Sequence, residues 1–342
     1  MSISENNRIA KNTMYLYIRM ALTMIVSLYT VRVVLNVLGE VDYGIYNVVG
    51  GIVVMFSFLS STLASASQRY FAFELGRQNT QKLSNVFNLT LYLYLLVVCI
   101  VVLLSETIGL WFLNTKINIP IERMVAAKYV YQFSVFSFCY SLVMTPYQAL
   151  LIAREDMNVY AFVGVLESIL YLAVAFLIKA IKFDHLIIYG LLILIVRITT
   201  QSIYIIIAYK RYPESHIKWY WDSYLVKDMA SYSGWNLLGA IANVARSQGI
   251  NILISMFFSP AINAARGLAH QVSGTLNSFA SNFYTAVRPQ VTKRYAMGDE
   301  NSTNSLIFSS SKFSYYLILF LAASVIVYVG PILQLWLVKV PQ

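Results

Sequence analysis

Four arginines of this chain, Arg19, Arg197, Arg246 and Arg266, lie within long apolar stretches. A charged side chain in the middle of an apolar helix costs about 2.5–3.5 kcal/mol on insertion scales, so such residues normally face protein or water. A guanidinium group also stays charged and can bind phosphate through two parallel hydrogen bonds. These positions therefore predict a water-accessible chamber that binds an anion, with a pyrophosphate group as the best fit.

Helical periodicity places further polar side chains on four faces, each within about 60° of one line at 100° per residue. The faces are Asn12, Tyr15, Arg19, Thr23 and Thr30; Gly44, Asn47, Gly51, Thr62, Ser65 and Arg69; Asn236, Gly239, Asn243 and Ser247, with Arg246 at the edge; and Asn263, Arg266, His270, Gly274, Asn277, Ser281, Tyr284, Thr285 and Arg288. We expect these faces to line one cavity between two lobes. The predicted substrate ligands are Arg19, Arg266, Arg246, Arg197, Asn47, Asn236, Asn243, His270 and Asn277.

Glu167 is the acid that is predicted to face the interior, which makes it the candidate for ion coupling. It can equally form a structural pair with Arg197 that neutralises both charges. His270 can equally be an interior histidine bonded to a neighbour, and the small and hydroxyl residues can be close-packing faces. With one acid against several arginines, the chamber favours anions over organic cations.

The composition predicts a membrane protein. The 342 residues are 58% hydrophobic and 12% charged, with a mean hydropathy of +0.64, whereas a soluble domain is about 25% charged. Apolar segments long enough for a bilayer core recur along the chain. The expected fold class is an all-α polytopic transmembrane bundle of nine spans, at residues 12–37, 43–72, 84–113, 123–152, 157–180, 186–209, 229–258, 261–290 and 306–338.

The remaining features of the composition do not indicate a specific function. The first span is too long for the core of a cleavable signal. Cys99 and Cys139 lie in apolar runs and indicate neither a disulfide nor a metal site. The formal charge of +10 is explained by basic loops on the cytoplasmic side, without nucleic acid. The loops on the side of the N-terminus hold most of the loop lysines and arginines, so we expect a cytoplasmic N-terminus.

The one long connection, between the sixth and seventh spans, is the expected boundary between lobes. Residues 1–211 then form an N-terminal lobe of six spans, 212–227 an amphipathic interfacial linker, and 228–342 a partial C-terminal lobe of three spans. Helical spacing of apolar and aromatic residues predicts a linker helix on the inner surface, and an ordinary loop with aromatic anchors is the alternative. The residues are Ile217, Tyr220, Trp221, Tyr224 and Leu225.

Three pairs of identical residues are separated by the same number of positions, which suggests that the chain consists of two related halves. They are Gln68 with Gln290, Gly76 with Gly298, and Asn79 with Asn301.

Three short motifs resemble the oligosaccharide flippases, the Wzx-type O-antigen and capsule exporters of the multidrug/oligosaccharidyl-lipid/polysaccharide superfamily. They are L-G-x-x-D-Y-G-I-Y from Leu38, Q-R-Y-x-x-F-E-L-G from Gln68, and Val287-Arg288-Pro289-Gln290. The resemblance covers essentially the whole chain. It implies a MATE-like fold with two lobes in a V, and alternating access that can be coupled to a proton or sodium gradient. The implied cargo is a glycan on undecaprenyl pyrophosphate, carried across the bacterial inner membrane.

For the site, the resemblance implies only that the cavity is lined by cationic side chains. Arg19 and Arg266 are the first candidates for this lining. Its implied partners are the lipid-linked glycan, membrane lipid and other polysaccharide-assembly proteins, with no cofactor, metal or nucleic acid. The family usually has twelve or more spans, so we expect the second lobe to be incomplete, as in a fragment or a truncated chain.

Two other functions compete with a flippase. A MATE-type small-molecule or ion antiporter would be favoured by an acidic cavity. A membrane-embedded glycan polymerase or transferase would need a catalytic acid or base, or a metal-binding acidic cluster. The predicted outer loops are short, and the carboxylate pairs Glu155-Asp156 and Asp299-Glu300 are interpreted as solvated loop charges. We therefore expect no enzyme activity.

Overall fold

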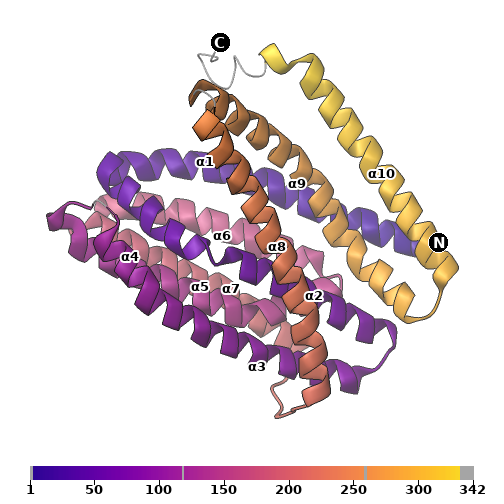
Figure 1. The fold of residues 1–342 in the computed structure, drawn as a ribbon. Helices are drawn as coiled ribbons and strands as arrows, with labels where there is room; N and C mark the ends of the chain where they lie inside the picture. The colour runs from indigo at the N-terminus through magenta and orange to yellow at the C-terminus, as the bar shows by residue number, and fades with distance from the viewer. Residues whose placement is uncertain (1–2, 118, 258–259, 332–342) are drawn as a thin grey trace.

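The computed structural model describes residues 3–117, 119–257 and 260–331, which form a helical bundle with no strand in these ranges (Figure 1). The predicted all-α class is therefore confirmed. The long helices are α1 (Ile3–Val54), α2 (Ser57–Gly76), α3 (Thr80–Leu104), α5 (Met124–Ala153), α6 (Met157–Leu177), α7 (His185–Arg211), α8 (Ser223–Phe257), α9 (Pro260–Ala296) and α10 (Glu300–Val327). Short segments flank them, namely the π-helix η1 (Ser105–Gly109), α4 (Leu110–Thr115), and the 3₁₀ turns η2 (Ile121–Arg123), η3 (Ile178–Ala180) and η4 (Pro213–Ser215).

Long apolar helices make this a multi-pass membrane protein. Within the described ranges, six segments are long and apolar enough to cross a bilayer. They are Asn7–Val53, Thr80–Thr115, Ile121–Ala153, Met157–Ala180, His185–Arg211 and Glu300–Val327. The predicted spans fall on helices. The first span and the beginning of the second are joined in α1 across Gly39, whose φ of 77° redirects the chain, and the rest of the second span lies in α2. The end of the last predicted span, beyond residue 331, lies outside the described residues.

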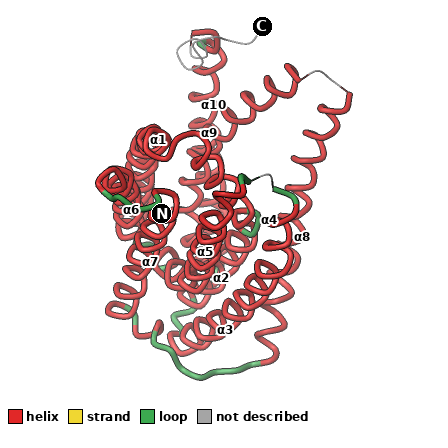
Figure 2. The backbone as a smooth tube through the Cα atoms, turned by 90° about the vertical axis from the view of Figure 1, so that its left-hand side faces the viewer, coloured by secondary structure: helices red, strands yellow, loops and turns green. Residues whose placement is uncertain are grey.

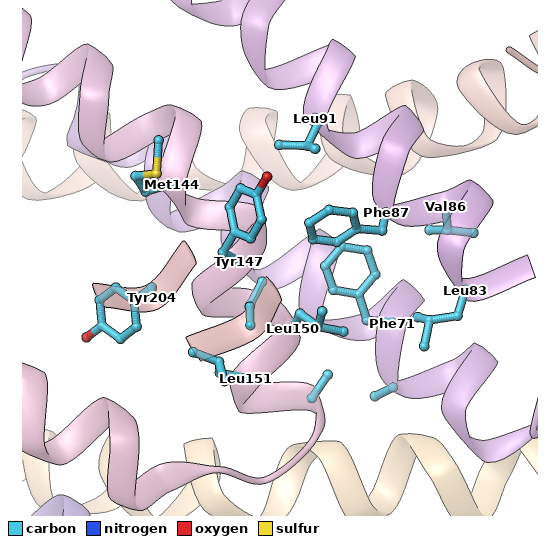
Figure 3. Close-up of a cluster of buried hydrophobic side chains, with 14 of the residues drawn as sticks. Phe71, Leu83, Val86, Phe87, Leu91, Met144, Tyr147, Leu150, Leu151 and Tyr204 are labelled. Carbon is cyan, nitrogen blue, oxygen red and sulfur yellow. The ribbon is translucent and has the colours of Figure 1, made fainter. Parts of the chain in front are cut away.

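Helices α1–α7 pack into one N-terminal body around aromatic residues. Figure 3 shows Phe71 of α2, Phe87 of α3 and Tyr147 of α5 facing one another. The Phe71 and Phe87 ring centroids are 5.7 Å apart, and those of Phe87 and Tyr147 are 5.1 Å apart. Leu150, on the same helix as Tyr147, is fully buried in this cluster. The cluster fixes α2 and α3 against α5, and so fixes the walls of the cavity described below.

The C-terminal helices α8–α10 join this body mainly at one end. We call this the proximal end; it holds the N-terminus and the turns at 77–79, 154–156 and 297–299. Here the second half of α9 contacts α1 and α2: Phe279 O accepts from Tyr17 Oη at 3.1 Å, and Arg288 Nη1 donates to Ser65 Oγ at 3.1 Å. Toward the distal end α8–α10 spread away from the N-terminal body (Figures 1 and 2), and Gly274 has open space around it.

Glu155 lies at the centre of the proximal joint, so its interpretation as a solvated loop charge was wrong. Its side chain is 3% exposed and accepts from Lys293 Nζ at 2.6 Å and Gln290 Nε2 at 3.1 Å, both on α9. Arg8 of α1 lies 2.9 Å away. The adjacent Asp156 is also paired, with Arg211 at 3.2 Å. Two loop carboxylates therefore bind neighbouring helices because the turn that carries them is covered by α1, α7 and α9.

The predicted linker helix is a second correction. Residues 217–222 are not helical; η4 precedes them and α8 begins only at Ser223. The buried Asn88 side chain bonds this strip to α3, donating to His216 O at 3.3 Å and accepting from Lys218 N at 2.6 Å. Asp222 caps α8 by accepting from Tyr224 N at 2.9 Å. Two tertiary hydrogen bonds of Asn88 therefore take the place of the local helical bonds that the spacing predicted.

The three proximal turns share one backbone geometry. Gln78, Glu155 and Gly298 each have a positive φ, at 56°, 68° and 77°, immediately before the N-terminal cap of the next helix. By this geometry Gly298 is equivalent to Gln78 and not to Gly76. The repeat suggested by the sequence identities is therefore present in the form of the turns, but in a different register.

Candidate functional site

A cavity of about 930 Å³ lies within the N-terminal body, near the upper end of the range of about 300–1,000 Å³ that is typical of ligand pockets. Helices α1, α2, α5, α6 and α7 line it. Most of its polar lining consists of hydroxyl and amide side chains, which can donate and accept hydrogen bonds without carrying charge. These residues are Thr23, Ser27, Thr30, Ser57, Ser60, Ser61, Gln68, Ser134, Ser137, Ser141, Thr145, Gln148, Ser168 and Gln201.

Tyrosine rings form much of the remaining wall. The lining includes Tyr46, Tyr160, Tyr171, Tyr189 and Tyr204, from α1, α6 and α7. The rings of Tyr46 and Tyr189 pack edge to face with centroids 4.7 Å apart. Such residues offer an apolar face and a polar tip. The cavity is therefore suited to a ligand with both hydroxyl groups and flat apolar surfaces.

Glu167 and Arg197 form an ion pair in the cavity wall. Arg197 Nη1 lies 2.5 Å from Glu167 Oε1, and the same oxygen accepts from Tyr171 Oη at 2.8 Å. The pairing that the sequence left as one of two alternatives is therefore present. Because the two charges cancel, neither contributes much net field to the cavity.

Arg19 differs from Arg197 in that no carboxylate of the described residues holds its side chain. An aromatic ring and a glycine position it instead. Its guanidinium carbon lies 4.2 Å from the centre of the Tyr160 ring. A Cβ added at Gly164 would lie 2.9 Å from Arg19 Cδ, so the glycine makes room for the side chain. The Nε atom is buried without a hydrogen-bond partner, and no ion pair to Arg19 is found among the described residues. Arg19 thus supplies an uncompensated positive charge.

The charged lining residues are Arg19, Arg197 and Glu167, which sum to one positive charge. In a partly dehydrated site, a charge without a partner is costly until a ligand neutralises it. The cavity therefore favours an anionic group beside Arg19, with uncharged polar groups along the rest of the wall.

The other predicted ligands do not line this cavity. Arg266 Nη2 lies 3.4 Å from His270 Nε2 on α9, and Arg246 is exposed on α8. The amides of four asparagines are exposed and donate to carbonyls of their own helices; these are Asn47, Asn236, Asn243 and Asn277. The arrangement differs from the expected shared cavity because α9 contacts the N-terminal body through its second half.

Two features of the cavity differ from what the sequence predicted. The polar residues of α5, Ser134, Ser137, Ser141, Thr145 and Gln148, follow helical spacing and could have been recognised as a fifth face. On the second span the predicted face was wrong, because the cavity is lined by another face of the same helical spacing, which holds Tyr46, Gly50, Val53, Ser57, Ser60, Ser61, Ala64 and Gln68.

Comparisons with known proteins address the fold. No protein-family model matches the sequence, and no curated protein matches it. Among solved structures, a multidrug resistance MATE family transporter of the MOP superfamily in an outward-facing conformation superposes with a TM-score of 0.81, at 15% identity over 97% of this chain and 74% of its own. The chain has the MATE transporter fold.

Two further MATE structures show the same likeness. A MATE transporter in the bent conformation gives a TM-score of 0.80 at 15% identity, over 97% of this chain and 74% of the other. The Vibrio cholerae MATE transporter VcmN gives 0.76 at 14% identity, over 97% and 75%. At these identities the likeness establishes the MATE fold alone.

Proposed function

We propose that this chain moves an oligosaccharide linked to undecaprenyl pyrophosphate across the bacterial inner membrane by alternating access, with its N-terminus in the cytoplasm. The observation that carries this proposal is the uncompensated guanidinium of Arg19 in a cavity otherwise lined by neutral polar groups. A pyrophosphate placed beside Arg19 would neutralise it through charge-assisted hydrogen bonds.

The rest of the wall supports the glycan part of the proposal. The hydroxyl and amide side chains of α2 and α5 can exchange hydrogen bonds with sugar hydroxyls, and the five tyrosines offer flat surfaces. The lipid tail would stay in the bilayer between the diverging lobes. Loosening of the proximal joint and closure at the distal end would then re-expose the headgroup on the other side.

A MATE-type small-molecule or ion antiporter is the second candidate, and Glu167 is the observation that favours it. A cavity carboxylate can bind a proton or a cation once Arg197 releases it. The fold likeness to multidrug transporters is consistent with this function. The two proposals differ in which charged residue the cargo needs, Arg19 for a pyrophosphate and Glu167 for a cation.

The test uses the native host with the gene deleted and supplied in trans. We expect Arg19→Ala to abolish surface glycan at normal protein level, with completed lipid-linked units accumulating on the inner leaflet. Arg32→Ala is the matched control, because Arg32 is an exposed arginine of the same helix outside the cavity lining, and it should leave surface glycan unchanged.

Normal surface glycan in the Arg19→Ala strain would count against the proposal. Drug sensitivity that follows Glu167→Gln and not Arg19→Ala would support the antiporter. Single unpolymerised units on the outer leaflet of the deletion strain would indicate a polymerase. Arg266→Ala tests separately whether Arg266 also contacts the cargo.

A further inference from the structure

A second pocket, of about 470 Å³, lies between α2 and α8. Its lining contains one cation, Arg69, and one anion, Asp228, together with the rings of Tyr70, Tyr232 and Trp235. Trp235 is 74% exposed, so the pocket opens to the surroundings of the bundle. The pocket is separate from the cavity beside Arg19.

Among the described residues, neither Arg69 nor Asp228 forms an ion pair. The Arg69 guanidinium carbon lies 4.3 Å from the centre of the Tyr232 ring, and in the described part of the chain no carboxylate pairs with it. Tyr70 Oη donates to Asp228 Oδ2 at 2.8 Å, which orients the carboxylate and leaves Oδ1 available. The pocket thus presents a positive and a negative group that are held by aromatic residues and not by each other.

The depth of the pocket matches the headgroup region of one leaflet. Arg69 precedes the end of α2 at Gly76 by seven residues, or about 10 Å along the axis. Asp228 follows the start of α8 at Ser223 by a similar distance. The exposed Trp219 and Trp221 of the preceding strip lie at the same end, and such aromatic side chains are enriched at membrane interfaces.

We propose that this pocket binds the phosphoethanolamine headgroup of a membrane lipid. The phosphate accepts hydrogen bonds from Arg69, and the ammonium donates to Asp228 Oδ1 while it lies against the exposed aromatic rings. Each charge of the headgroup thereby meets one opposite charge of the pocket. An anionic headgroup or a free phosphate has no ammonium group for Asp228, and its negative charge would be repelled by this carboxylate. A choline headgroup keeps the charge but lacks the N–H donors.

The pocket is independent of the cargo in the larger cavity, so this inference goes beyond the proposed flippase function. Its readout is lipid binding to the purified protein, and surface glycan plays no part in it. Failure of one proposal therefore leaves the other standing.

The experiment measures binding of phosphatidylethanolamine, phosphatidylcholine and phosphatidylglycerol to the full chain. The protein–lipid complexes are released from detergent, and their masses are measured by native mass spectrometry. We expect phosphatidylethanolamine to bind about tenfold more tightly than phosphatidylglycerol, the size of one charge-assisted hydrogen bond. Asp228→Asn should remove this preference by weakening phosphatidylethanolamine and strengthening phosphatidylglycerol. Arg69→Gln should weaken all three lipids.

Two matched variants change net charge without touching the pocket. Lys227→Gln removes an exposed cation next to Asp228, and Glu122→Gln removes an exposed acid at the distal end. Both should bind the lipids as the wild type does. If the wild-type protein binds phosphatidylglycerol as tightly as phosphatidylethanolamine, the proposal is overturned without any mutation. An unchanged preference in a folded Asp228→Asn protein would overturn it as well.

Discussion

Lys293 Nζ donates to Glu155 Oε1 at 2.6 Å and so connects α9 to the turn between α5 and α6. Glu155 has a φ of 68°, where the equivalent turn between α9 and α10 has Gly298. A non-glycine residue in this region costs on the order of 1–3 kcal/mol. The contacts to Lys293, Gln290 and Arg8 are what Glu155 gains in return.

Glu155→Gly should therefore open the proximal joint while it relaxes the turn. Removing one partner of a buried charge pair typically costs about 3–5 kcal/mol, which exceeds the strain that the glycine relieves. The separation between spin labels at the exposed positions Gln81 and Asn304, measured by pulsed electron resonance, should shift to longer distances. Gln78→Gly makes the same backbone change at an exposed side chain and should leave the distance distribution unchanged. Equal distributions in the two variants would show that Glu155 does not hold the joint.

Gly76→Ala should destabilise the same joint through packing. A Cβ at residue 76 would clash with Lys293 O and lie 2.8 Å from Lys293 Cα, and backbone atoms cannot turn aside. Overpacking of this kind costs about 1–3 kcal/mol, so the midpoint of thermal unfolding should fall. Gly274→Ala is the control, because it adds a methyl group in open space and improves helix propensity by up to about 1 kcal/mol. A midpoint that rises in both variants would contradict the close approach of α2 and α9.

Tyr160 should position Arg19 through its ring and not its hydroxyl. The ring centre lies 4.2 Å from the guanidinium carbon, and such a contact contributes roughly 1–2 kcal/mol when partly desolvated. Tyr160→Leu should weaken binding of the proposed cargo, undecaprenyl pyrophosphate, to the purified protein about 5- to 30-fold, whereas Tyr160→Phe should bind it as the wild type does. Equal loss in both variants would assign the effect to the hydroxyl group and remove the stacking argument.

The fold class and part of the site could be predicted because their signals are local. Apolar segments define the helices, and the cost of a charge in lipid indicated that Arg19, Arg197 and Glu167 face inward, as the cavity lining shows. The α5 face was equally visible in the spacing of its serines.

The errors at residues 216–222, at Glu155 and at α8 and α9 share one physical origin, which is contact between segments that are distant in the chain. The amide of Asn88 holds residues 216–218 extended although their spacing favours a helix. Glu155 is buried because α9, more than a hundred residues later, lies over its turn. The positions of α8 and α9 relative to the cavity depend on how the two lobes meet, and periodicity within one helix carries no information about that.

Asp184 and Arg123 provide a prediction for pH at the distal end. Burial alone would raise the Asp184 pKa, but hydrogen bonds from Arg123 and from the backbone N–H groups of Ile187 and Leu186 outweigh it and hold the pKa below the ordinary 3.8. A carboxylate whose pKa is lowered by folding stabilises the protein above its unfolded pKa, and this contribution is lost as the pH falls through the folded value. Asp184→Asn keeps a side chain that can cap α7 but removes the charge. The difference in unfolding midpoint between wild type and Asp184→Asn should thus be constant above about pH 5 and shrink below pH 3.8. A difference that grows on acidification would mean that the pair with Arg123 does not form.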